Sequence, residues 1–370
     1  MTLNSCRKSG AAYVLVVIVV FGIAKAWAAQ DSSAGNLRRL GLDAFDQGRY
    51  SDAEKNLRLA LDAFAAGRNS FETAKTFADL ATVLTAEERF LEAEQLLDVA
   101  LHLMPEEIGA HAQETARLLG NLAALYERTG RYAAAESAFN RALRVLEQYE
   151  PEDPHVVVLL SNLASLRVQT GNYKQAQMEL RKALVLGERR VGSDHSDLVP
   201  VLTNLAGLYE RRSKWVLAES YLLRAGSIIE HSPRHDDPDR AVILEHLGVV
   251  HYRQRKLSQA EMELRHSLDI TNGTLGMESF RSVRTSLHLA KVLVSERRYD
   301  EARILYSNAL TVQERLLGTK APEVATTLEN FGRLLHAMKN HGPADEMEAR
   351  ARRIRAELAY TRSATDAQRW

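Results

Sequence analysis

Residues 121–136 read Asn-Leu-Ala-Ala-Leu-Tyr-Glu-Arg-Thr-Gly-Arg-Tyr-Ala-Ala-Ala-Glu. Apolar residues recur every three to four positions before the glycine, which is the period of an amphipathic helix. Gly130 interrupts the pattern, and glycine is the residue that most easily takes the left-handed conformation that ends a helix. The stretch therefore predicts two helices joined by a tight turn.

The same pattern recurs along the whole chain at a nearly constant interval. Its marker is the alanine of the segment aromatic-x-x-Ala-(Glu/Gln), which starts each predicted second helix. Successive marker alanines are 40 to 42 residues apart, and the eight are Ala53, Ala93, Ala135, Ala176, Ala218, Ala260, Ala302 and Ala344. An interval this regular indicates a chain built from one repeated structural unit.

Other positions repeat in register with the marker alanine. Thirteen residues before it stands a large apolar residue, namely Leu40, Leu80, Leu122, Leu163, Leu205, Leu247, Leu289 or Phe331. The residue after that one is small in every unit: Gly41, Ala81, Ala123, Ala164, Ala206, Gly248, Ala290 or Gly332. We expect these small residues where two antiparallel helices cross. Because one helix pair cannot bury its apolar face alone, the units must stack.

Segments such as residues 121–136 resemble tetratricopeptide repeats. The 42-residue period is similar to that of the kinesin-light-chain-type repeats, as are the linkers 191–197 and 317–323. The resemblance covers roughly residues 35 to 355. It implies an all-α fold, a right-handed superhelical solenoid of about eight antiparallel helix pairs, and a protein-binding role, although this family is defined by architecture more than by function.

The repeat pattern gives the predicted boundaries. The array spans 35–342, with units at 35–69, 75–108, 115–150, 156–192, 198–232, 240–275, 282–317 and 324–342 onward, followed by a polar capping helix at 343–362 and a tail at 363–370. Some units depart from the pattern. Glu88, Ser213, Arg255 and Arg297 replace the turn glycine, Leu257 replaces the aromatic residue, and residues 339–343 stand where the eighth turn should be.

The first residues have the anatomy of a secretory signal peptide. Arg7 and Lys8 precede an apolar run over 11–24, and a small-x-small exit at 26–28 follows. We expect cleavage after Ala28 and export to the periplasm or the medium. The alternative is an uncleaved anchor in the inner membrane, and only in that case do we expect contact with a membrane. Cys6, the single cysteine, lies in this segment, so a cleaved chain has no thiol chemistry.

Composition and motifs argue against most kinds of chemistry. Lys+Arg and Asp+Glu both number 48, so charge does not favour nucleic acid. No phosphate loop, HExxH or GxSxG motif occurs. The histidines and carboxylates of residues 231–237 are interpreted as a polar loop between units and not as a metal site. We therefore expect no enzyme, no metal, no cofactor and no small-molecule substrate.

The predicted binding surface is the concave face that the first helices of such repeats line. The position just before the repeated apolar residue holds Asn121, Asn162, Asn204, His246, His288 and Asn330. Asparagine offers both a donor and an acceptor, which suits the backbone of an extended peptide. Near the C-terminus Lys291 and Arg333 would receive carboxylates of the bound segment, helped by Arg128, Arg211 and Arg253. A hydrated lining without a ligand explains the asparagines equally well.

Three hypotheses follow for the whole protein. It is an exported scaffold that binds a protein or peptide partner, a membrane-anchored assembly factor with the same array, or an enzyme with an unrecognised site in the groove. The first is favoured because no acid, base or metal-ligand groups converge at the inner positions.

Overall fold

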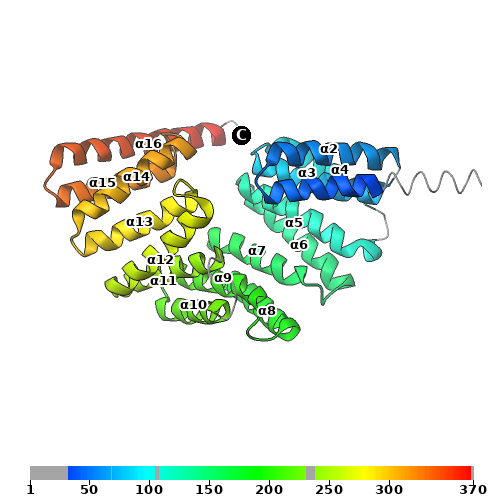
Figure 1. The fold of residues 1–370 in the computed structure, drawn as a ribbon, viewed down its shortest axis with the longest axis horizontal. Helices are drawn as coiled ribbons and strands as arrows, with labels where there is room; N and C mark the ends of the chain where they lie inside the picture. The colour runs from blue at the N-terminus through cyan, green and yellow to red at the C-terminus, as the bar shows by residue number, and fades with distance from the viewer. Residues whose placement is uncertain (1–31, 68, 105–107, 231–237, 368–370) are drawn as a thin grey trace, which may run out of the picture. The chain divides into compact units, whose positions relative to one another are not determined.

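A computed structural model describes residues 32–67, 69–104, 108–230 and 238–367. In this part of the chain the secondary structure is helical throughout (Figure 1). A helix over residues 32–46 opens the array. The other α-helices are α2 (Tyr50–Ala66), α3 (Ser70–Ala86), α4 (Phe90–Leu103), α5 (Ala112–Arg128), α6 (Tyr132–Tyr149), α7 (His155–Gln169), α8 (Tyr173–Val191), α9 (Val199–Arg211), α10 (Trp215–Glu230), α11 (Pro238–Arg253), α12 (Leu257–Leu275), α13 (Phe280–Ser295), α14 (Tyr299–Leu317), α15 (Pro322–Ala337) and α16 (His341–Ala367).

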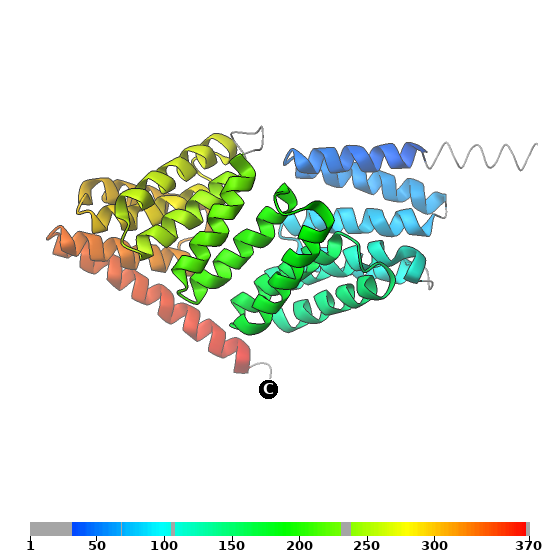
Figure 2. The same cartoon turned by 90° about the horizontal axis from the view of Figure 1, so that it is seen from below.

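These helices follow one another as hairpins, which the perpendicular view in Figure 2 also shows. Short 3₁₀ turns, η1 (Ile108–His111) and η2 (Ser196–Leu198), precede α5 and α9. The expectation of an all-α repeat fold is confirmed. Observed starts differ slightly from the predicted ones: the second unit begins at Ser70 and not at 75, because Asn69 caps α3 by accepting a hydrogen bond from the Glu72 N–H.

Every hairpin turn has the same backbone geometry. The residue that ends the first helix has a positive φ in all eight turns: Gly48, Glu88, Gly130, Gly171, Ser213, Arg255, Arg297 and Lys339. In the sixth turn, Arg255 N–H donates to the Tyr252 carbonyl at 3.1 Å and Lys256 N–H to the His251 carbonyl at 2.9 Å. This pair of hydrogen bonds is the Schellman motif, which ends a helix. The predicted left-handed turn is therefore present even where the sequence lacks glycine.

The repeated small residues lie where the two helices of a hairpin cross. All eight marker alanines are fully buried. Opposite them, a Cβ added at Gly248 would come within 2.5 Å of the Leu264 side chain and 3.3 Å of the Ala260 carbonyl. The missing side chains thus permit the close approach of the backbones that the sequence pattern predicts.

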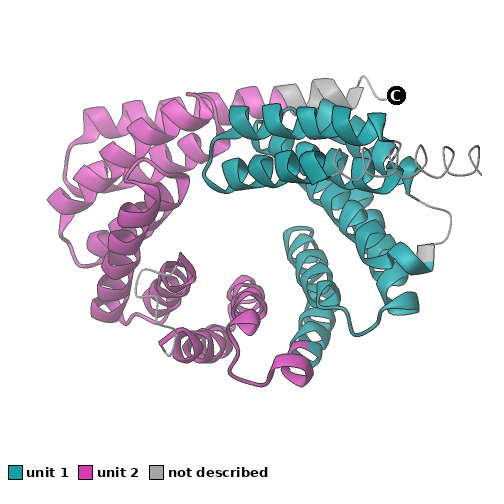
Figure 3. Cartoon of the chain, turned by 45° about the vertical axis from the view of Figure 1, so that its right-hand side comes forward, with its two compact units in different colours: residues 1–186 teal, residues 187–370 magenta. Residues whose placement is uncertain are grey.

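The chain divides into two compact units, residues 1–186 and 187–370, and the division falls within the sequence of α8 (Figure 3). Inside each unit, consecutive first helices touch: α3 contacts α5, α5 contacts α7, α9 contacts α11, and α11 contacts α13. These first helices therefore form a layer of their own within each unit. Their side chains that do not pack against the second helices make up the predicted binding surface.

Ion pairs connect successive hairpins within a unit. The glutamate that follows a marker alanine binds a basic residue near the next turn: Glu54 with Arg89 at 2.9 Å, and Glu261 with Arg298 at 2.6 Å. Glu94 pairs with Arg131 at 2.7 Å in the same way. All these groups are partly exposed, so each pair contributes little to the stability of the fold.

The C-terminal boundary differs from the prediction. We expected an eroded eighth unit and a separate capping helix at 343–362. Instead α16 begins at His341 and runs to Ala367, and it packs against α15 as the second helix of the eighth hairpin. The positive φ of Lys339 supplies a turn that the sequence seemed to have lost. Ala344, Ala351 and Ile354 join the hydrophobic core of this unit.

The predicted signal segment 1–28 and the loop 231–237 lie outside the described residues. Within the described ranges, none of the helices combines the length and the apolar character that a membrane span requires.

Candidate functional site

A cavity of about 420 Å³ opens between the first helices α9, α11 and α13 of the second unit. It is lined by Gly207, Glu210, Arg211, Trp215, Glu245, His246, Val249, Arg253, Arg284 and His288. Arg211, His246, Arg253 and His288 were predicted at the binding surface, and the structure brings them together here. Glu210, Trp215, Glu245 and Arg284 were not predicted.

Glu245 is the buried acid of this cavity. Only 4% of its side chain is exposed. Arg284 binds it with two hydrogen bonds, from Nε to Oε1 at 2.8 Å and from Nη2 to Oε2 at 2.6 Å. His288 Nδ1 lies 3.3 Å from Glu245 Oε1. Burial alone would raise the pKa of Glu245, but His288 and Arg284 outweigh burial and lower this pKa to about 2. Glu245 is therefore a permanent, internally neutralised anion.

His246 is also engaged within the protein. Its Nδ1 lies 2.6 Å from Glu210 Oε1. Burial disfavours the charged ring, yet the hydrogen bond and charge of Glu210, helped by the charge of Glu245, raise the pKa of His246. Both predicted histidines thus pair with acids of neighbouring first helices.

Four cations of this unit lack such a partner. Among the residues that the structure describes, no carboxylate pairs with the lining residues Arg211 and Arg253, or with Lys291 and Arg333 further along. Arg253 lies over the Trp215 ring, with Cζ 5.7 Å from its centroid. Burial, and then the positive charge of Arg253, lower the pKa of Lys291. An anion bound between Arg253 and Lys291 would relieve this repulsion.

The other predicted residues are distributed over both units. Asn204 is half-buried on α9, and Asn330 on α15 accepts a hydrogen bond from Arg333 Nη1 at 3.3 Å. In the first unit Asn162 is exposed on α7, and Asn121 Nδ2 lies 3.5 Å from Thr82 Oγ1. Arg128 stacks over Phe90 at 5.4 Å and lies 3.8 Å from Glu88. These five residues do not line the cavity of the second unit.

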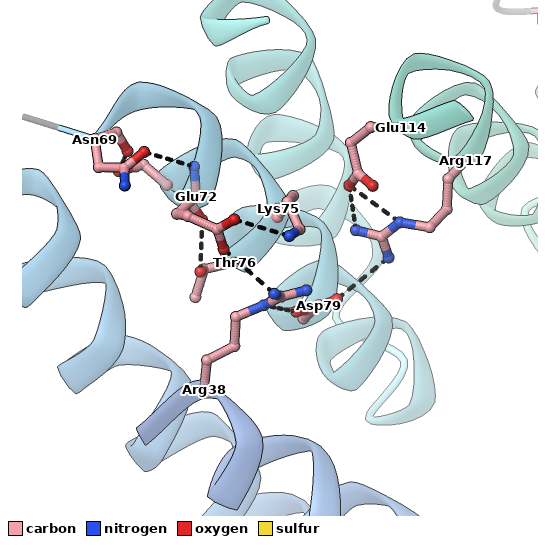
Figure 4. Close-up of polar contacts among 9 residues, drawn as sticks. Arg38, Asn69, Glu72, Lys75, Thr76, Asp79, Glu114 and Arg117 are labelled. Carbon is pink, nitrogen blue, oxygen red and sulfur yellow. Dashed lines mark hydrogen bonds and ion pairs between the residues drawn. The ribbon is translucent and has the colours of Figure 1, made fainter. Parts of the chain in front are cut away.

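A buried acidic centre in the first unit was not predicted. Asp79 precedes Leu80 and so holds the same repeat position as the asparagine row, but only 5% of it is exposed. Its carboxylate accepts hydrogen bonds from Arg38 Nε at 2.6 Å and Arg117 Nη1 at 3.2 Å (Figure 4). Arg117 also donates to Glu114. The two arginines come from the first helices before and after α3, so this cluster holds three consecutive hairpins together.

Asp79 with Arg117 and Glu245 with Arg284 show a common arrangement. In both, an acid near the repeated leucine accepts from an arginine five residues before the next such leucine. The repeat register therefore contained a signal for these pairs, but only a comparison of neighbouring units would have found it.

Stacked helix hairpins with left-handed turns and alanine crossings define a helical repeat protein. The sequence model for the tetratricopeptide repeat matches residues 72–148, 114–189, 155–225, 197–272 and 282–357, which together cover more than half of the chain. The chain belongs to the tetratricopeptide-repeat family.

Two solved structures agree with this fold, and a third is similar to part of the chain. BtubC (BKLC) from P. vanneervenii is 25% identical, with a TM-score of 0.53 over 62% of this chain and 92% of that protein. A tetratricopeptide repeat protein from Parabacteroides merdae is 18% identical, with a TM-score of 0.51 over 76% of this chain and 93% of the other. A putative kinesin light chain of Podosopora anserina is 19% identical, with a TM-score of 0.48 over 56% of this chain and 98% of that one. No curated protein matches the sequence.

Proposed function

We propose that the protein is a non-enzymatic scaffold that binds an extended, acidic segment of a partner protein along the first helices of its second unit. Tetratricopeptide repeats generally mediate contacts between proteins, and this family membership supports the general role. The observation that carries the finer proposal is that four cations of the first helices have no carboxylate partner among the described residues, namely Arg211, Arg253, Lys291 and Arg333.

The geometry favours a segment with carboxylates over a neutral or basic one. Arg253 and the neighbouring Lys291 form the positive centre, and Arg211 lines the same cavity as Arg253. Glu245 is already neutralised by Arg284, and Glu210 is already paired with His246. Charge-assisted hydrogen bonds to carboxylates are about twice as strong as neutral ones. We expect the half-buried Asn204 and Asn330 to bond backbone groups of the segment.

The pattern of the first residues supports a proposal about where in the cell the protein acts. We propose export by a cleaved signal peptide, with retention of the segment as a membrane anchor as the alternative. The mass of the N-terminal peptide of the protein purified from cells distinguishes these two cases. An unrecognised enzymatic site remains the third hypothesis, and activity screening with and without a chelator tests it.

Binding is tested with the purified protein and a library of fluorescent peptides that are acidic, neutral or basic at matched length. Acidic peptides should bind, and the double variant Arg253→Gln with Lys291→Gln should weaken them by roughly tenfold or more, since two charge-assisted contacts are lost. Arg303→Gln is the matched control, because Arg303 is exposed on the second helix α14. Equal affinity for the three peptide classes, or equal weakening by the control, would refute the proposal.

A pull-down tests the same site without assuming a ligand. The protein is expressed with its own leader in a Gram-negative host, crosslinked, and purified beside the double variant. A partner that is recovered with the wild type and lost with the folded double variant supports the assignment. A partner recovered equally with both moves the binding surface to another face.

A further inference from the structure

His251, in α11, is buried between two carboxylates from the neighbouring second helices. Its Nδ1 lies 2.7 Å from Glu263 Oε2 of α12, and its Nε2 lies 3.0 Å from Glu219 Oε1 of α10. Only 5% of the residue is exposed. A carboxylate can only accept hydrogen bonds, so both contacts are satisfied only when both ring nitrogens carry a proton. The arrangement therefore requires an imidazolium.

The repeat provides an internal comparison for this arrangement. Arg167 holds the same position two repeats earlier, and it too lies between two glutamates. Its Nε donates to Glu136 Oε1 at 3.1 Å, and its Nη1 contacts Glu179. Glu136 and Glu219 both follow a marker alanine, whereas Glu179 and Glu263 both lie three residues after one. The same three-helix ion cluster is thus built once around a permanently charged side chain and once around a titratable one.

The surrounding charges determine what happens when His251 loses a proton. Glu219 keeps two other donors, Gln254 Nε2 at 2.7 Å and Lys256 Nζ at 3.0 Å. Glu263 has no second partner within the described part of the chain, and only 9% of it is exposed. From α9 and α13, which also pack against α11, no charged group of the described residues contacts the imidazole.

A neutral imidazole has one N–H and one lone pair. It can therefore serve only one of the two carboxylates, and its lone pair then faces the other. If the proton stays towards Glu219, the buried Glu263 has no donor. If the proton stays towards Glu263, the lone pair and Glu219 repel each other. In both cases one of the two neighbouring helices loses its bond to α11.

We propose that His251 is a pH-sensitive clasp, which as an imidazolium holds α10, α11 and α12 together and on deprotonation loosens them. Arg167 is the pH-insensitive form of the same clasp. Because α11 also carries His246 and Arg253, loosening changes the wall of the cavity described above. The clasp itself does not depend on what that cavity binds.

The sign of the effect follows from linkage. Hydrogen bonding to Glu263 and to Glu219 raises the pKa of His251 against the opposing effect of burial. A group whose pKa is raised on folding stabilises the fold fully below its unfolded pKa of about 6.5 and loses this effect as the pH rises through the folded value. One proton is involved, so the opening constant of these helices can rise at most tenfold for each pH unit in that window.

Hydrogen exchange of the full-length protein tests the clasp between about pH 5.5 and about pH 8.5, the range in which histidine titrates. After correction for intrinsic exchange, protection of residues 257–275 should fall with pH in the wild type. In His251→Arg, which copies the Arg167 cluster, the part of this fall that His251 causes should disappear. In Arg167→His it should persist, and a second pH-dependent fall should appear in residues 173–186. Other histidines, including His246, contribute equally to the wild type and to His251→Arg.

His251→Gln keeps the proposal testable if the arginine variant does not fold. This neutral variant should show, at every pH, the weak protection that the wild type reaches at high pH. An NMR titration of the His251 ring should give a midpoint above the usual histidine value. Identical pH profiles of protection in the wild type and in either His251 variant, or a midpoint below the usual value, would overturn the proposal.

Discussion

The strained turns make a direct prediction about stability. Arg255, Arg297 and Lys339 have φ values of 67°, 64° and 61°. All three are exposed, and none has an ion-pair partner among the described residues. The left-handed conformation costs a residue with a Cβ roughly 1–2 kcal/mol. Glycine avoids this cost, but its greater conformational freedom in the unfolded chain makes folding about 0.5–1 kcal/mol less favourable.

Each change to glycine should therefore stabilise the protein by about 0.5–1 kcal/mol. The three turns belong to different hairpins, so their effects should add, and the triple variant should gain about 2 kcal/mol. For a unit of this size that corresponds to a rise in melting temperature of roughly 4–8 °C. Circular dichroism during heating and urea titration measures both quantities.

Two controls separate turn strain from loss of charge. Arg303→Gly removes the same side chain from the exposed surface of α14, where the backbone is helical, and should cost about 1 kcal/mol. Gly130→Arg creates the strain in a turn with φ of 72° and should be destabilising. A triple variant that melts at or below the wild-type temperature would show that these turns carry no strain that glycine can relieve.

Three further predictions concern buried groups. Asp79→Ala leaves Arg38 and Arg117 without their shared acceptor and should lower the free energy of unfolding by about 2–3 kcal/mol in urea titration. A smaller loss would rule out a structural role for the cluster. Folding lowers the pKa of Glu245 from 4.5 to about 2. Glu245 therefore stabilises the fold fully above pH 4.5 and loses this stabilisation, roughly 3 kcal/mol, as the pH falls through about 2. Glu245→Gln should lack this acid-dependent part of the urea midpoint, and an unchanged acid profile would argue against the pairing. Ala260→Leu overpacks the fully buried crossing of two helices and should cost about 1–3 kcal/mol of stability. Ser258→Leu, on the exposed side of the same helix, should be nearly neutral. Similar melting temperatures of the two variants would contradict the assignment of Ala260 to the crossing.

Local patterns predicted the repeated hairpin well because its determinants are close in sequence. Helical periodicity, the marker alanine and the turn position all act within about forty residues, so the sequence alone determined an all-α array of stacked pairs. The eighth hairpin was underestimated because residues 339–343 stand at its turn and depart from the repeat pattern. In fact the packing of α15 against α16 outweighs the local cost of the positive φ of Lys339.

Partners of individual side chains could not be read from one unit, because they come from the next unit. The sequence placed His246 and His288 at the inner surface, but only the tertiary structure pairs them with Glu210 and Glu245. Likewise the equivalence of Arg167 and His251 acquires a physical meaning only where both are seen between two glutamates. The sequence by itself determined which helices form and where they turn, since these depend on local periodicity and backbone preference. Tertiary structure decided which charges are neutralised and which remain available for a ligand, since this depends on distances between hairpins that stacking alone sets.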